Sequence, residues 1–215
     1  FPDSNYSIIT IRSTGNVEAS RIGKDRAISD TQYHFDGGYA ELLVYDIPLT
    51  DKEIERVEGY LAHKWGLDGD LPNMHSYKSE SNSSRGEEFL YDSNLPVESF
   101  QYDFFSHEQV YKNSDLLSRW RFEEQGEIIG EKIAWDVGLG RNHGYFTGDA
   151  KLGAGRFGKG LILDGDGDYL DIPHFRGLFE DTNFTLSAWL QLDDIGVDGD
   201  QQDAAIFATD GDGDD

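Results

Sequence analysis

Cysteine is absent from this 215-residue sequence. Without thiols, the chain has no disulfide framework, no zinc–thiolate site and no thiol-based catalysis. This fits a secreted bacterial protein stabilised by its core and by ions, and it fits a cytosolic protein equally well. Long hydrophobic runs are also missing, and no apolar stretch is long enough to cross a bilayer. We therefore expect no membrane insertion.

Basic residues are scarce. The sequence has 18 Lys and Arg against 42 Asp and Glu, which gives a formal net charge of −24. Such a surface repels nucleic acid and anionic lipid at moderate salt, so we expect no nucleic-acid partner. It attracts divalent cations, although most of the acidic side chains are interpreted as a solvated surface.

Hydrophobic residues make up 37% of the chain and aromatic residues 13%, enough for a packed core. β-Branched and alternating residues predict strands, with glycine marking many of the turns. Residues 39–46 (YAELLVYD) are apolar on both sides, which is typical of a strand buried on both faces. The predicted strands lie at 6–12, 17–22, 39–46 and 116–122, and near 143–147, 156–163, 168–172, 184–192 and 204–208.

A helix is predicted over about residues 51–65. Thr50 and Glu53 have the spacing of a capping box, and Gly66 stands where a helix ends in a left-handed residue. An apolar stripe recurs at helical spacing and predicts the face that packs on the strands. This stripe consists of Ile54, Val57, Leu61 and Trp65.

Two sets of motifs carry a family resemblance over about two thirds of the chain. The first set reads YAELLVYD, LTDKE, YLAHKWGL and, at 71–78, LPNMHSYK. The second set comprises Trp120–Glu124, the turn Asn142–Gly144, Gly155–Leu161, Asp164–Asp171 and FTLSAWL at 184–190. The first set resembles the end, and the second the beginning, of laminin-G-like (concanavalin-type) domains of large secreted bacterial proteins.

The resemblance implies an all-β fold, an antiparallel β-sandwich (jelly roll) with one packed helix. It divides the chain into the C-terminal portion of one domain (1–78), a linker (79–112) and the N-terminal portion of a second domain (113–215). Because residue 1 is Phe, we interpret the sequence as a fragment with no signal peptide in it. The resemblance also implies an extracellular or cell-surface location, adhesion, a polysaccharide, glycan or protein ligand, and often a structural calcium.

Asp164, Asp166 and Asp168 alternate with glycine and are the candidate metal ligands. Calcium needs several hard oxygen ligands, and closely spaced carboxylates on a flexible turn can supply them. An EF-hand is excluded, because Tyr169 and Phe175 occupy its sixth and twelfth positions. A tight acidic turn without metal explains the pattern equally well. Asp210, Asp212 and Asp214 repeat it, and a plain turn is the stronger interpretation there.

Catalytic motifs are not found, so we expect that the protein is not an enzyme. There is no paired-acid strand of the glycosidase kind, no nucleophile elbow and no P-loop, and the six histidines lack zinc spacing. Exposed aromatic rings could stack on sugars, but burial in the core is the commoner fate of each. The candidate rings belong to Trp135, Tyr145, Phe146, Tyr169 and Phe175.

Three functions therefore stay open. The leading interpretation is a non-catalytic binding and adhesion module of a large exported protein. The alternatives are an accessory segment of a carbohydrate-active enzyme and a structural spacer repeat. Since each portion alone would expose an unpaired strand edge and an apolar face, we also predict that 1–78 and 113–215 dock together. Contacts between strands 39–46 and 116–122 would show this.

Overall fold

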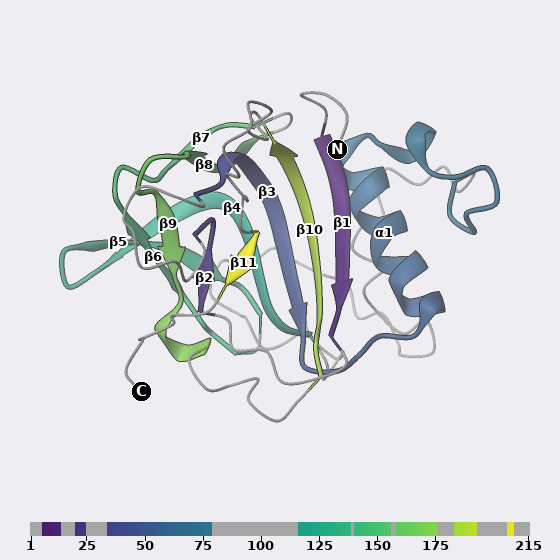
Figure 1. Cartoon of the computed structure of the whole chain (residues 1–215), viewed down its shortest axis with the longest axis horizontal. Helices are drawn as coiled ribbons and strands as arrows, with labels where there is room; N and C mark the ends of the chain where they lie inside the picture. The colour runs from purple at the N-terminus through teal and green to yellow at the C-terminus, as the bar shows by residue number, and fades with distance from the viewer. Residues whose placement is uncertain are drawn as a thin grey trace, which may run out of the picture.

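Figure 1 shows the computed structural model, in which strands form a curled antiparallel sheet with a helix, α1 (Asp51–Trp65), against it. The structure describes residues 6–13, 20–24, 34–78, 116–138, 140–155, 158–175, 183–192 and 206–208. Its strands are β1 (Tyr6–Arg12), β2 (Arg21–Ile22), β3 (Asp36–Tyr45), β4 (Leu116–Ile128), β5 (Glu131–Asp136), β6 (Gly144–Thr147), β7 (Lys151–Ala154), β8 (Lys159–Asp164), β9 (Tyr169–Asp171), β10 (Thr185–Leu192) and β11 (Phe207–Ala208). Two short 3-10 helices, η1 (Asp68–Asp70) and η3 (Pro173–Phe175), follow α1 and β9.

Strands from residues 1–78 (the first segment) and 113–215 (the second segment) interleave within the sheet. The strand order is β1-β10-β3-β4-β5-β6-β9-β2-β11, and β8 joins β3 to β7. β1 and β3 come from the first segment, and β10 and β4 from the second. Leu42 pairs with Trp120 and Leu43 with Arg119 across β3 and β4, which confirms the predicted docking. The division into portions of two domains stays a prediction, and its linker (79–112) lies outside the described residues.

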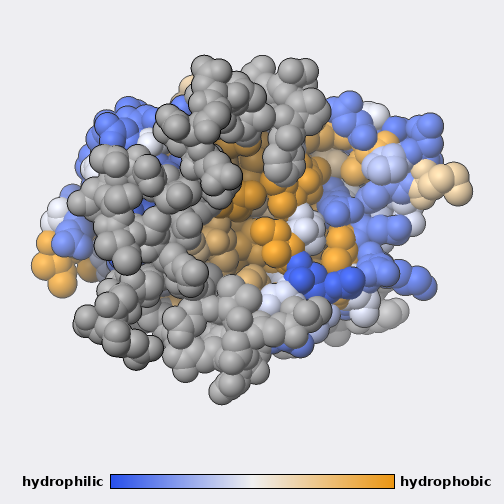
Figure 2. All heavy atoms as spheres, viewed as in Figure 1, coloured by the Kyte–Doolittle hydropathy of each residue, from blue (hydrophilic) through white to orange (hydrophobic). Residues whose placement is uncertain are grey.

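β3 is buried on both faces, as its sequence predicted. Tyr39, Leu42 and Val44 belong to one hydrophobic cluster, and Leu43 and Tyr45 to another on the opposite face. The mostly β architecture is therefore confirmed, whereas a two-layered jelly roll stays a prediction. Figure 2 shows hydrophobic residues gathered over the central strands, with hydrophilic residues to the side of α1.

The helix has the predicted bounds and caps. The Thr50 hydroxyl accepts from the backbone N–H of Glu53, and the Glu53 carboxylate accepts from the backbone N–H of Thr50 at 2.7 Å. Gly66 ends the helix with φ of 70°. Of the predicted stripe, Val57, Leu61 and Trp65 are buried and Ile54 is half-buried against the same cluster. None of the helices in the described ranges is long and apolar enough to span a bilayer.

A buried ionic network joins α1 and β3 of the first segment to β4 of the second. Glu41 on β3 is fully buried, and its Oε1 accepts from Arg119 Nε on β4 at 2.7 Å. The same oxygen accepts from the Tyr60 hydroxyl at 2.9 Å. Its Oε2 accepts from Lys64 Nζ at 2.8 Å and from Trp65 Nε1 at 3.1 Å. The network therefore satisfies a carboxylate that would otherwise be costly to bury.

Candidate functional site

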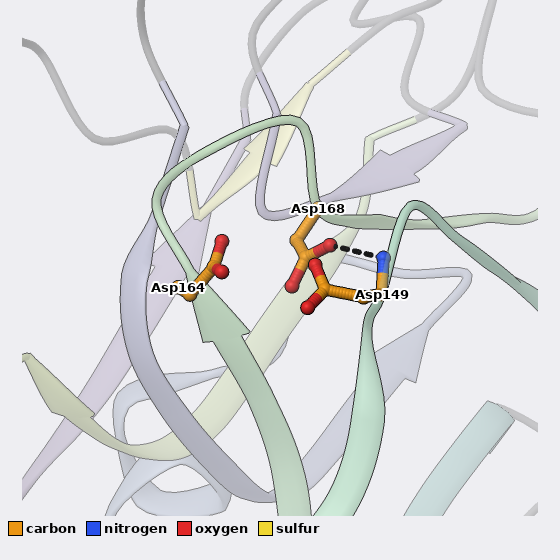
Figure 3. Close-up of side chains that lie close together, drawn as sticks. All are labelled: Asp149, Asp164 and Asp168. Atoms are coloured by element: carbon orange, nitrogen blue, oxygen red, sulfur yellow. Dashed lines mark hydrogen bonds between the residues drawn. The ribbon is translucent and has the colours of Figure 1, made fainter.

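Three aspartates from two turns converge at one end of the sheet. Asp149 lies in the turn that follows β6, Asp164 ends β8, and Asp168 lies just before β9. One carboxylate oxygen from each lies within 4.8 Å of the other two. Figure 3 shows the three side chains pointing toward a common space. This arrangement places several hard oxygen atoms close together, as a calcium ligand set requires.

One backbone-to-carboxylate hydrogen bond joins the two turns, and another closes the second turn. The backbone N–H of Asp149 donates to Asp168 Oδ1 at 2.7 Å, which is the dashed line in Figure 3. Gly148 precedes this contact with φ of 71°, and a Cβ on it would lie 2.4 Å from Asp168 Oδ1. Glycine is therefore required where the first turn approaches the second. The backbone N–H of Asp166 donates to Asp164 Oδ1 at 2.9 Å and closes the second turn.

The electrostatics of the cluster favour a bound proton or cation. Asp168 is only 2% exposed, whereas Asp149 and Asp164 are exposed. Burial raises the pKa of Asp168, and the neighbouring charges of Asp149 and Asp164 raise it further, although the backbone hydrogen bond from Asp149 opposes this. Three carboxylates thus repel one another in a site where one of them is largely shielded from water.

The sequence identified part of this cluster. Asp164 and Asp168 are brought together as predicted, but Asp166 is exposed and does not belong to the group. Asp149 takes the third position, and sequence reasoning missed it because it lies 15 residues before Asp164, on a separate turn. The Gly148-Asp149 pair predicts a turn, but it does not show that this turn lies beside the one that carries Asp164 and Asp168. Asp210, Asp212 and Asp214 lie outside the described residues.

A cleft of about 860 Å³ adjoins the cluster. Its size is within the range of small-ligand sites. Asp149 and Gly148 belong to its lining, so the cluster and the cleft share one turn. Its other lining residues mix aromatic, basic and acidic side chains. They are Glu131, Lys132, Tyr145, Phe146, Thr147, Ala150, Lys151, Asp171 and Pro173.

The five candidate aromatic residues lie in different environments. Phe175 is fully buried in the core, where its ring meets Trp120 edge-on. Tyr145 and Phe146 are half-buried and line the cleft, with Phe146 also packed against the core. Tyr169 is half-buried, and Arg21 and Lys24 lie about 5 Å from its ring centre. Trp135 is 39% exposed and packs against His143 outside the cleft.

The turn Asn142–Gly144 is explained by structure rather than by chemistry. Asp136 accepts from the backbone N–H of Asn142 at 2.7 Å, and the Asn142 side chain donates to the Ser118 hydroxyl at 2.8 Å. His143 Nδ1 accepts from the backbone N–H of Asp136 at 3.1 Å. These contacts fasten the turn to β4 and β5.

Comparison with known proteins yields no relative. The chain matches no protein-family model, and neither a curated protein nor a solved structure matches it. The laminin-G-like resemblance therefore stays a prediction that rests on the motifs.

Proposed function

We propose that the protein is a non-catalytic binding and adhesion module of a large extracellular protein. Its ligand is a carbohydrate or another protein, and a structural calcium ion supports the site. The observation that carries the proposal is the convergence of Asp149, Asp164 and Asp168 beside an open cleft of mixed polar and aromatic lining. The laminin-G-like resemblance supports the extracellular assignment.

The chemistry of the three aspartates fits calcium. They supply only oxygen ligands, and calcium takes six to eight of these, so backbone carbonyls or waters would complete the set. When bound, the ion would neutralise the repulsion among the carboxylates. Asp149 belongs to both the cluster and the cleft. A calcium ion bound by both turns would therefore also hold one wall of the cleft in place.

Calcium titration of the full chain tests this proposal. A ligand that binds only the folded state stabilises it, by about 2.7 kcal/mol at a concentration 100 times its Kd. We expect calcium to raise the melting temperature (Tm), a chelator to reverse the rise, and acidification to weaken it as protons compete for the carboxylates. The measurement is a thermal melt followed by circular dichroism.

The turn itself offers a matched control. Asp164→Asn should abolish the calcium-dependent rise in Tm, whereas Asp166→Asn, an exposed acid on the same turn, should retain it. No rise in the unmodified protein would show a plain acidic turn. Equal loss in the two variants would show that calcium responds to the charge of the whole turn rather than to the cluster of Asp149, Asp164 and Asp168. A pure spacer would show no affinity for saccharides or peptides, which separates that alternative from a binding module.

A further inference from the structure

The turn between β4 and β5 presents a large apolar side chain to solvent. Ile129 is 98% exposed, and Ile128 beside it is half-buried. Ile128 pairs with Glu131, so Ile129 and Gly130 form a two-residue hairpin turn. Figure 1 shows this hairpin reaching out from the side of the sheet, and Figure 2 shows hydrophobic residues at its outer end.

The backbone of this turn is unfavourable for isoleucine. Ile129 has φ of 53° and Gly130 has φ of 83°, the left-handed values that a type I′ turn requires at both central positions. Asn-Gly is the preferred pair there, whereas a β-branched residue with positive φ is a rare outlier. Because Ile129 is exposed, its side chain also contributes no hydrophobic free energy through burial in the core. Neither local conformation nor the core therefore explains isoleucine at this position.

The hairpin is continuous with the cleft. Glu131 and Lys132, the first residues of β5, line the cleft, and Ile129 precedes them in the turn of the same hairpin; we call this hairpin, residues 124–132, the rim of the cleft. Glu124, Glu127 and Glu131 are exposed along the two strands of the hairpin, with Lys132 paired opposite Glu127. The rim thus combines one apolar contact point with an excess of negative charge.

We propose that Ile129 is a contact residue for a protein partner that occupies the cleft and its rim. The partner presents an apolar pocket or side chain for Ile129, bordered by lysine or arginine. This inference rests on the proposed function and names the ligand class of that site. Strained backbone conformations cluster at functional sites, and anchors that an interface buries carry much of the affinity of protein–protein contacts.

Other ligand classes fit the rim less well. An anionic membrane would be repelled by the three glutamates and by the net charge of −24. A second copy of the chain carries the same charge, which opposes self-association. A saccharide within the cleft could stack on Tyr145 but has no use for an aliphatic side chain outside it.

Selection from a phage-displayed library of random 12-residue peptides, with the full chain immobilised, tests the proposal. We expect peptides with an apolar residue flanked by basic residues. Ile129→Asn should weaken their binding, measured by calorimetry, by about tenfold or more. The same variant should raise Tm by a few degrees, because asparagine tolerates positive φ. Opposite effects on binding and Tm would not arise from a merely structural residue.

Controls make the outcome decisive. Ile129→Val should keep the affinity and the unmodified Tm, and Met74→Ala, at another exposed apolar residue, should change neither. Peptides that bind Ile129→Asn equally well, a lower Tm in that variant, or binding of saccharides alone would overturn the inference. A calcium response without peptide binding would overturn this inference and leave the proposed function standing. Peptide binding without a calcium response would overturn the calcium site alone.

Discussion

At the scale of single residues, Glu41 is a fully buried carboxylate. Burial alone would raise its pKa, but the charges and hydrogen bonds of Arg119 and Lys64 outweigh burial and lower the pKa from 4.5 to about 2. For Lys64, burial and the nearby Arg119 and Arg121 lower the pKa despite Glu41. We therefore regard Arg119, whose guanidinium stays protonated, as the partner that keeps Glu41 ionised.

We predict that Glu41→Gln lowers the free energy of unfolding by about 3–5 kcal/mol, because it leaves Arg119 buried without a counter-charge. The pKa of Glu41 is depressed by folding, so its stabilising contribution is complete above about pH 4.5 and is lost as the pH falls toward 2. The variant should therefore show a shallower loss of stability across this window. Urea unfolding at several pH values measures both effects. Glu124→Gln, at an exposed position, is the control and should match the unmodified protein.

At the scale of secondary structure, α1 contains its own start and stop signals, and packing adds to them. The capping box at Thr50 satisfies backbone groups that helix termini leave unpaired, and left-handed Gly66 ends the helix. The buried residues Val57, Leu61 and Trp65 then fasten the helix to the hydrophobic cluster on its face of the sheet.

Thr50→Ala should cost about 1 kcal/mol of unfolding free energy, because it removes the hydroxyl that caps the helix. The fold should remain, since the packed face of α1 is unchanged. Denaturant unfolding measures the loss, with Lys52→Ala, at an exposed position in the first turn, as the matched control. A cost in Lys52→Ala equal to that in Thr50→Ala would show that capping is not the cause.

At the scale of the whole molecule, the two segments are held by alternating strand pairing rather than by a simple interface. β10 of the second segment lies between β1 and β3 of the first, and β3 lies between β10 and β4. The Glu41–Arg119 ion pair crosses the same junction. Neither segment could leave without exposing backbone hydrogen-bonding groups and apolar side chains on both faces of β3.

We predict that cutting the chain between residues 79 and 112 leaves both fragments in one complex. A specific protease site inserted there provides the cut, and the uncut insertion variant is the control. Size-exclusion chromatography should show an unchanged elution volume, because the pairing between segments persists. Tm should fall and become dependent on concentration, since association is no longer intramolecular. Separation of the fragments under native conditions would contradict the interleaved sheet.

The amino-acid sequence by itself determined features whose signals are local. The bounds and caps of α1 follow from Thr50, Glu53 and Gly66, and the burial of β3 on both faces follows from its consecutive apolar residues Leu42–Tyr45. Asp164 and Asp168 were recognisable because a short Gly-rich turn separates them. In contrast, Glu131–Asp136 and Lys151–Ala154 were not predicted as strands, because neither shows clear alternation of apolar and polar residues. They are strands because Glu131–Asp136 pairs with β4 and Lys151–Ala154 pairs with β8.

Only the tertiary structure decided which distant residues meet. It replaced Asp166 by Asp149 in the acidic cluster, placed Tyr145 in the cleft and Phe175 in the core, and paired Glu41 with Arg119. These outcomes depend on strand register and on the order of strands in the sheet. A shift of one residue in register moves every side chain to the opposite face, and no short stretch of sequence encodes that choice.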